Sequence, residues 1–309
     1  MPTSIHEIDL HYLGVPGAIA TWAVEGPQGW VLVEAGPERS WPELKRGLES
    51  LGLSPSDLVA VLLTHVHLDH AGGAWQLAQL GVPIHVHERG ARHLVDPTKL
   101  LASATRIYGD NMERLWGRLE PCPGNTVHAV TDGDSLDIAG LRFRAVETTG
   151  HATHHIAWSL EDSTPATIFT GDAAAMLIPG TNWISIPMPP PELDPDAWYA
   201  SIDRLEGGHW TRLCLTHGGT VEADDVTSHL ERLRTGLQEH ISIIEHLQTT
   251  ESDEASRMAA YRAWLLDSAN QAGIEEGKFD RYVTQGLLTM NLTGVARYLH
   301  QQAASVQDD

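Results

Sequence analysis

Four side chains that can bind metal ions lie within six consecutive positions, directly after a short apolar segment. That segment, residues 58–64, is rich in β-branched side chains and leaves no room for a helix, so it predicts a buried strand. His65, His67, Asp69 and His70 follow it in the sequence THVHLDHAGG. Burying these four side chains without a metal would leave several polar groups unpaired, which is costly. The cluster therefore predicts a metal site at the end of a strand.

The spacing of the four donors suits two ions. Residues two apart on an extended chain point the same way, so His65 and His67 can converge on one ion. Asp69 and His70 come where the chain turns into a helix, and they can face a second ion. Residues 71–73 are Ala-Gly-Gly, small enough for the backbone to pass close to the metals. Imidazole and carboxylate donors suit Zn²⁺ first, with Fe and Mn as alternatives.

HVHLDH resembles the H-x-H-x-D-H signature of the metallo-β-lactamase superfamily, and later segments resemble the rest of that family's pattern in the same order. They are TGH at 149–151, FTGD at 169–172 and LTHG at 215–218. The resemblance covers residues 5–220. It implies seven metal ligands: His65, His67 and His151 on one ion, Asp69, His70 and His217 on the other, and Asp172 bridging both.

The order of segments also matches that family, which implies an α/β (α+β) fold: a four-layer αββα sandwich of two mixed β-sheets. We predict strands at 5–13, 19–24, 30–33, 58–64, 84–86, 126–130, 141–147, 155–160, 167–170 and 213–216. Helical segments are predicted at 40–51, 74–80, 88–120 (with turns at 96–97 and 109–110) and 194–205. Apolar residues then recur at three-to-four spacing from about 221 to 302. We therefore expect a catalytic domain at 1–220 and a C-terminal helical extension at 221–309 packed on it.

The resemblance implies the chemistry of a metal-dependent hydrolase. Two cations that share a carboxylate can also share a water and lower its pKa toward neutrality, which gives a bridging hydroxide near pH 7. One ion would polarise the substrate's carbonyl or phosphoryl oxygen while the hydroxide attacks. Asp69 is the catalytic candidate, because it can orient the nucleophile or accept its proton. No G-x-S-x-G segment indicates a serine nucleophile, and no residue is assigned to an organic cofactor.

Departures from the patterns of known members narrow the substrate. Position 172 is Asp, where true β-lactamases have Cys or Ser, which argues against antibiotic hydrolysis. The chain continues as AAAMLIPGTN, without the Cys- and Arg-containing loop of glyoxalase II-like thioesterases, which argues against a hydroxyacyl-glutathione substrate. HVHLDHAGG is similar to the motif of quorum-sensing lactonases. We predict a hydrolase of a small ester, thioester or lactone. The alternatives are a phosphoester or phosphodiester hydrolase and, less favoured, a persulfide dioxygenase with a single iron.

The excess of acidic over basic residues limits the kinds of partner that the protein can bind. The chain has 20 Lys and Arg against 41 Asp and Glu, a formal charge of −21. Such a chain repels phosphate backbones and anionic membranes, so we expect a small-molecule substrate and neither nucleic acid nor membrane. No secretory signal or membrane span is visible, which favours the cytoplasm. In some family members a helical extension mediates dimer contacts, so a homodimer is a candidate assembly.

Other side chains are weaker candidates. His155 has two interpretations, support behind the site or ordinary packing. His85 and His87 form an H-x-H pair, but no Asp-His follows, so we do not assign them as ligands. Residues 88–125 and the C-terminal helices are expected to set specificity. Candidate pocket residues there and nearby are Arg106, Tyr108, Trp116 and Trp183, each with packing as the alternative.

Overall fold

The computed structural model describes residues 4–161 and 163–305, and its longer strands form two sheets. The first sheet consists of β1 (Ser4–Asp9), β2 (Ala20–Gly26), β3 (Gly29–Val33), β4 (Leu58–Leu62), β5 (Ile84–His87) and β6 (Val127–Val130). The second consists of β7 (Ser135–Ile138), β8 (Leu141–Glu147), β9 (Ile156–Leu160), β10 (Thr167–Gly171), β13 (Arg212–Leu215) and β14 (Thr220–Glu222). The short strands β11 (Met176–Leu177) and β12 (Ile184–Ser185) pair with each other.

Both sheets are mixed. The first has the order β1-β2-β3-β4-β5-β6, antiparallel from β1 to β3 and parallel from β3 to β6. The second has the order β14-β13-β10-β9-β8-β7, in which β10 and β13 are parallel and the other pairs antiparallel. Parallel neighbours need long crossovers, which in this chain contain helices.

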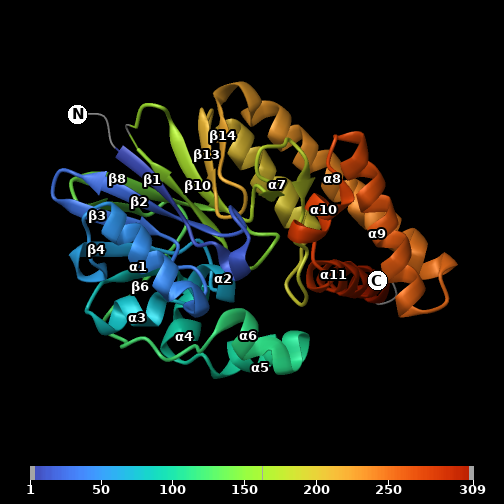
Figure 1. The fold of residues 1–309 in the computed structure, drawn as a ribbon, viewed down its shortest axis with the longest axis horizontal. Coiled ribbons are helices and arrows are strands. Elements are labelled where there is room, and N and C mark those ends of the chain that lie inside the picture. The colour runs from blue at the N-terminus through green and yellow to red at the C-terminus, as the bar shows by residue number, and fades with distance from the viewer. Residues whose placement is uncertain (1–3, 162, 306–309) are drawn as a thin grey trace.

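The helices lie on the outer faces of the sheets and beyond them (Figure 1). Those of the first half are α1 (Trp41–Ser50), α2 (Leu68–Ala71), α3 (Ala74–Gln79), α4 (Glu88–Val95), α5 (Thr98–Tyr108) and α6 (Met112–Trp116). Those of the second half are α7 (Pro195–Gly207), α8 (Ala223–Thr250), α9 (Glu254–Gln271), α10 (Glu276–Tyr282) and α11 (Gln285–Ser305).

Side-chain alternation in β2 shows how the layers form. Trp22 and Val24 lie in the core between the two sheets, where they share a cluster with Phe169 of β10. Ala23, between them in sequence, points to the opposite face and packs in the cluster that includes Leu48 of α1. This is the period-two alternation expected of a strand buried on both faces. On the far side of the second sheet, a separate cluster joins its strands to α7 and α8. The predicted four-layer αββα sandwich is confirmed.

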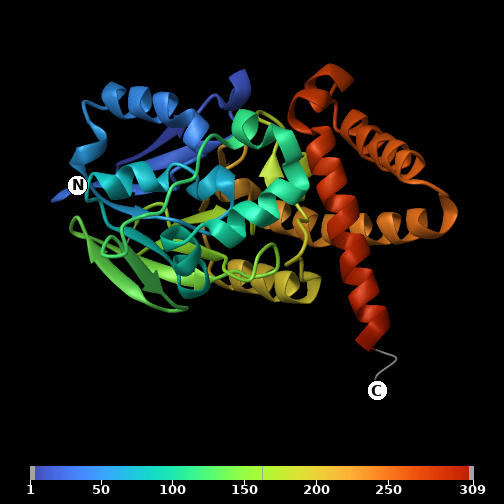
Figure 2. The ribbon, with the colours of Figure 1, turned by 90° about the horizontal axis from the view of Figure 1, so that it is seen from below.

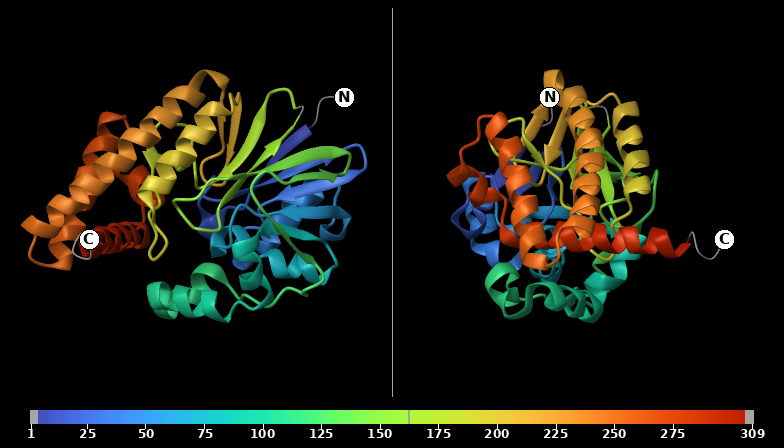
Figure 3. Two further views of the ribbon diagram at one scale, coloured as in Figure 1. Left: turned by 180° about the vertical axis from the view of Figure 1, so that it is seen from behind. Right: turned by 90° about the vertical axis from the view of Figure 1, so that its right-hand side faces the viewer.

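The C-terminal helices have a core of their own. Buried side chains of α8, α9, α10 and α11 form one cluster, which also includes Trp198 of α7 and residues of the segment 175–193. Helices α8 and α9 run side by side, and α11 crosses them (Figure 3). The division at residue 220 remains a prediction. Among residues 4–161 and 163–305, no helix has the length and apolar character needed to cross a membrane.

The predicted strand at 5–13 was too long. It ends at Asp9, and residues Tyr12–Gly14 form a 3₁₀ turn. The side chain of Asp9 accepts hydrogen bonds from the backbone N–H groups of His11 and Gly17, which folds the chain back on itself. The helical stretch predicted at 88–120 divides into α4, α5 and α6 at the predicted turns, but it ends at Trp116 and not at 120. Strand β7 was missed, because its sequence SLDI has little β-branched character.

A histidine inside the C-terminal core makes the fold sensitive to acid. Burial lowers the pKa of His240 to about 3, whereas an unfolded histidine titrates near 6.5. The unfolded state therefore binds a proton that the folded state excludes, and stability falls by about 1.4 kcal/mol for each pH unit as pH drops below 6.5. We expect His240→Phe to reduce that slope by about this amount. Urea unfolding at pH 7, 6, 5 and 4.5 measures it.

The matched control is His246→Gln, an exposed position on the same helix. It is expected to keep the slope of the unsubstituted protein. His240→Phe also removes the hydrogen bond between Nδ1 and the Tyr261 hydroxyl, 2.6 Å long, and so lowers stability at pH 7. If the free energy of unfolding changes equally with pH in His240→Phe and His246→Gln, His240 is not the source of the acid sensitivity.

Candidate metal centre

Seven predicted donors come together at one edge of the sandwich, where strands end. His65 and His67 lie in the loop after β4, and Asp69 and His70 lie in the short helix α2. The remaining three follow strands of the second sheet: His151 after β8, Asp172 directly after β10, and His217 after β13. Donor atoms lie within 4.8 Å of one another in three overlapping groups: His65, His67 and His151; His65, His70 and Asp172; Asp69, His70 and His217.

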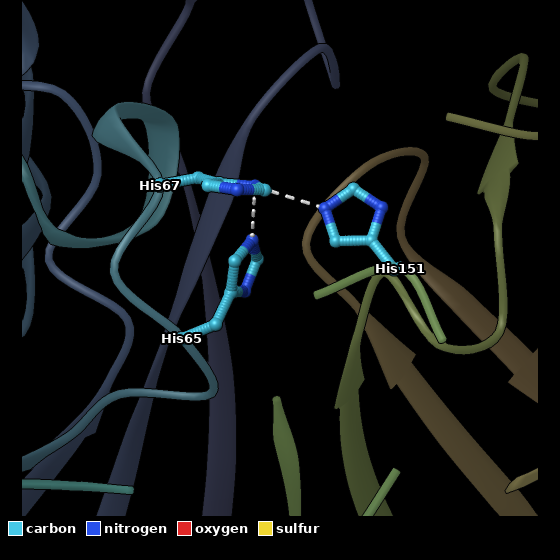
Figure 4. A group of neighbouring side chains, drawn as sticks. All are labelled: His65, His67 and His151. Carbon is cyan, nitrogen blue, oxygen red and sulfur yellow. Dashed lines mark hydrogen bonds between the residues drawn. The ribbon is translucent and has the colours of Figure 1, made fainter. Parts of the chain in front are cut away.

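The first group is made of three imidazoles (Figure 4). His67 Nδ1 lies 2.9 Å from His65 Nε2 and 2.9 Å from His151 Nε2. Burial lowers the pKa of His65 and of His67 well below the usual value, and the neighbouring imidazoles lower both further. Neutral rings that turn lone pairs toward one common point suit a cation there.

Asp172 lies between this group and the second. One carboxylate oxygen, Oδ2, is 3.3 Å from His151 Nε2. The other, Oδ1, is 3.2 Å from His70 Nε2 and 3.5 Å from His217 Nε2. Asp69 completes the second group, with Oδ2 3.6 Å from His217 Nε2. Asp172 is therefore placed to serve both groups at once.

Two buried atoms in this centre have no hydrogen-bond partner among the described residues, His70 Nε2 and Asp172 Oδ1. Burial would lower the pKa of His70, but the carboxylates of Asp172 and Glu34 raise it well above the usual value. This ring must therefore carry positive charge beside Asp172 unless a metal cation supplies that charge. Unpaired atoms and nearby carboxylates both fit a divalent metal, so the residues present suit the ions that the sequence predicts.

Sequence reasoning missed Glu34, which holds two of the donors in place. Glu34 is 1% exposed and follows β3 with a φ of 66°. Its Oε1 accepts hydrogen bonds from the Thr64 hydroxyl at 2.5 Å and from His70 Nδ1 at 3.0 Å. Because the Thr64 hydroxyl donates to Glu34, its oxygen accepts from His65 Nδ1 at 3.0 Å. One carboxylate thereby sets both rings in the tautomer whose Nε2 lone pair faces the centre.

Main-chain carbonyls fix the ring orientation and tautomer of two other donors, His151 and His217. His151 Nδ1 donates to the carbonyl of Pro187 at 2.9 Å, and His217 Nδ1 donates to that of Ala18 at 2.7 Å. His155 lies behind the centre, where its Nε2 accepts a hydrogen bond of 3.3 Å from the backbone N–H of Asp172. His155 thus supports the strand end that carries the shared carboxylate.

His85 and His87 lie outside the donor groups. His87 Nδ1 accepts a hydrogen bond from the backbone N–H of Arg89, which caps the start of α4. His85 stacks on His128, with ring centroids 5.1 Å apart. Both side chains therefore have structural contacts, as expected from the absence of a following Asp-His.

The C-terminal helices reach the centre through Asn291 of α11, which is 1% exposed. Its Oδ1 accepts from the backbone N–H of Met188, and its Nδ2 donates to the carbonyl of Ile186, both at 2.8 Å. These bonds fix the peptide segment around Pro187, whose carbonyl holds His151. Nδ2 also lies 3.1 Å from the hydroxyl of Tyr261 in α9. A donor of the first group, His151, is thus held through the helical extension.

A cavity of about 800 Å³ opens above the donors. His67, Asp69, His151, Asp172 and His217 form part of its lining. Residues of α5, α6, α10 and α11 also belong to its lining. Figure 2 shows α5 and α6 in green and the C-terminal helix α11 in red.

Of the predicted pocket residues, Tyr108 and Trp116 line this cavity. Arg106 does not, and Trp183 packs in the C-terminal core, where its Nε1 donates to the hydroxyl of Ser268. Tyr12, also in the lining, was missed. It lies in the 3₁₀ turn after β1, and its ring stacks on Trp116 with centroids 5.6 Å apart.

A four-layer sandwich with clustered His and Asp donors at one edge defines a class of metal-dependent hydrolases. Residues 14–217 match the model of the metallo-beta-lactamase superfamily. The chain belongs to that superfamily and is a metal-dependent hydrolase.

Relatives agree with this assignment. The metallo-beta-lactamase fold-containing protein ST1585 of Sulfurisphaera tokodaii is 26% identical over 244 residues, covering 77% of this chain and 87% of that one. A hydroxyacylglutathione hydrolase of Xylella fastidiosa is 28% identical over 218 residues, covering 70% of this chain and 66% of that enzyme. The chain thus matches slightly less than two thirds of that enzyme's length.

Solved structures share the fold. The family protein TTHA1429 of Thermus thermophilus has a TM-score of 0.71 at 20% identity, covering 98% of this chain and 94% of its own. The structure of ST1585 has a TM-score of 0.67 at 22% identity, covering 95% and 98%.

The role of Glu34 can be tested by metal affinity. We expect Glu34→Gln to weaken zinc binding about 10- to 100-fold, because the amide removes the negative charge beside His70 and the second oxygen that holds the backbone N–H of Thr64. Competition titration of the metal-free protein with a chromophoric chelator measures it. Glu25→Gln, an exposed glutamate on β2, is the control. Equal zinc affinity in both variants would contradict the assigned role.

The link through Asn291 predicts an effect on the first donor group. We expect Asn291→Leu to weaken binding of one metal ion about tenfold and to change the visible spectrum of the cobalt-substituted protein, because Pro187 no longer holds His151. Ser268→Ala is the control, since it removes a hydrogen bond of the same extension that leads only to Trp183. Loss of stability without any change in spectrum would show that Asn291 only supports the fold.

Proposed function

We propose that this chain hydrolyses a small ester, thioester or lactone in a site that holds two divalent metal ions, with hydroxide as the nucleophile. The placement of Asp172 carries the proposal. Its two oxygens face different donor groups, at 3.3 Å from His151 and 3.2 Å from His70. A single-ion site would not need a second set of donors on the far side of that carboxylate.

The two ions, when bound, supply Lewis acidity and lower the pKa of water toward neutrality. The chain supplies the rest. Asp69 lines the cavity, and its side chain is 24% exposed, more than the 4% of Asp172. Asp69 is therefore the carboxylate that can accept the proton of an attacking water from the cavity side. His151 and His217 keep fixed tautomers through their carbonyl partners, so the donor set needs little rearrangement during turnover.

The cavity supports a small-molecule substrate. A volume of about 800 Å³ is in the range of ligand sites, and most of the wall is apolar. The relative that is a hydroxyacylglutathione hydrolase supports an acyl ester or thioester as the bond cleaved. A net charge of −21 continues to argue against nucleic acid and anionic membranes as partners. Zinc as the metal, a homodimer and a cytoplasmic location remain predictions.

Metal content and a substrate panel test the proposal. We expect two zinc ions for each chain by elemental analysis. The zinc-loaded protein should hydrolyse p-nitrophenyl esters, thioesters or lactones faster than bis-p-nitrophenyl phosphate. Activity on phosphodiesters alone would favour the phosphodiesterase alternative. One iron for each chain, with oxygen consumption on a persulfide, would favour the dioxygenase.

Variants test the site itself. We expect His67→Ala and Asp172→Ala to lower kcat/KM by about 10³-fold or more, because each removes a donor from the centre. His85→Ala is the matched control, since His85 also belongs to an H-x-H pair but lies outside the donor groups. Unchanged activity in either donor variant would overturn the proposed mechanism.

A further inference from the structure

The walls of the cavity hold apolar side chains from three separate parts of the chain. Leu100, Ala104 and Leu115 come from α5 and α6, Ile178 follows β11, and Leu287 and Met290 come from α11. These residues lie on both sides of the donor groups. An apolar group bound between them would be removed from water on all its sides. Each methylene buried in this way stabilises the complex by about 0.8 kcal/mol.

Two apolar side chains in the cavity lining are unusually exposed. Leu13 is 42% exposed and Ile107 is 40% exposed, and both are among the few large exposed hydrophobic residues of the described chain. Leu13 lies in the 3₁₀ turn after β1, and Ile107 lies near the end of α5. Both side chains can therefore contact an apolar group bound in the cavity.

The lining holds three cationic and three acidic side chains, in a protein with about twice as many acidic as basic residues. Lys99, Arg114 and Arg281 line the cavity and are exposed. Within the described residues, none of the three has a carboxylate within ion-pair distance, and Arg114 bonds only to the Asn111 side chain, at 3.1 Å.

The acidic side chains of the lining are already engaged. Asp69 and Asp172 belong to the metal centre. Glu192 accepts hydrogen bonds from the backbone N–H and the hydroxyl of Thr153, both at 3.0 Å. Among the described lining residues the three cations therefore have no ion-pair partner, whereas Asp69 and Asp172 lie among the donor groups and Glu192 lies 3.5 Å from His154 Nε2.

We propose that the substrate is an amphiphilic anion, an ester or thioester whose apolar chain lies between α5, α6 and α11 and whose negatively charged group lies against Lys99, Arg114 and Arg281. The inference rests on the proposed function, since it names the substrate class of the same site. In the reaction water adds its oxygen to the acyl carbon, the carbon–sulfur or carbon–oxygen bond breaks, and the leaving thiol or alcohol takes up a proton. The cations hold the charged end and take no part in bond breaking.

Binding to the zinc-loaded protein, with thioether probes that contain no hydrolysable bond, tests this class without requiring hydrolysis. The probes are 3-(octylthio)propanoate and its neutral analogue 3-(octylthio)propanamide, with tryptophan fluorescence as the signal, because Trp116 lines the cavity. We expect the anion to bind about 10-fold more tightly at low salt, and the difference to shrink as ionic strength rises. Shortening the octyl chain should weaken binding about three- to fourfold for each methylene removed.

Two matched double variants place the anion. We expect Lys99→Gln with Arg281→Gln to bring the two probes to within about twofold of each other. Arg106→Gln with Arg297→Gln removes two exposed cations outside the cavity lining, from α5 and α11, and should keep the preference. All four positions are exposed, so the substitutions leave the core intact.

Equal binding of the two probes, no dependence on chain length, or no binding of either probe would overturn the inference. If the anion binds as expected but the zinc-loaded protein hydrolyses no ester, thioester or lactone, the proposed function fails while the binding class stands. If the zinc-loaded protein hydrolyses esters, thioesters or lactones without a preference for anionic substrates, the proposed function stands and the inferred substrate class fails.

Discussion

This structure depends on one constraint: several imidazoles and two carboxylates lie close together at one edge of an apolar sandwich. Five imidazoles and two carboxylates share a volume only a few ångströms across. Burial alone would raise the pKa of Asp172, yet His70, His151 and His217 hold it well below the usual value. The carboxylate therefore remains charged, and its charge must be met by cations. The ends of β4, β8, β10 and β13 bring these donors together.

Holding such a centre requires contacts one layer further out. Glu34 has a left-handed backbone conformation, unfavourable for a side chain of its size. It also buries a carboxylate in the core. Both costs are offset by the hydrogen bonds that it accepts from His70 and from two threonines, Thr64 and Thr216. The strained backbone of Glu34 thus places its carboxylate where it orders His70 directly and His65 through Thr64.

The sequence predicted the fold, and the seven side chains that it singled out come together at one edge; their role as metal ligands stays a prediction. The first four follow from a local signal, and His151, Asp172 and His217 from the resemblance to the family. Donors at spacings of two and one after an apolar strand can be found in a single segment, and the strands show themselves by β-branched runs. The supporting residues could not be found in that way. Glu34 acts on His70 from 36 positions away and Asn291 on residues 186–188 from more than 100. A glutamate at the end of the apolar run at 30–33 was a signal available in the sequence, but nothing local indicated its partners.

Asn291 follows all seven donors in the sequence, and this order has a consequence for biosynthesis. A nascent chain that has left the ribosome as far as His217 already contains all seven donors. The segment around Pro187 is then still without the side chain that clamps it from both sides. Helix α11 therefore completes the surroundings of His151, and the first donor group reaches its final geometry only after Asn291 has also left the ribosome.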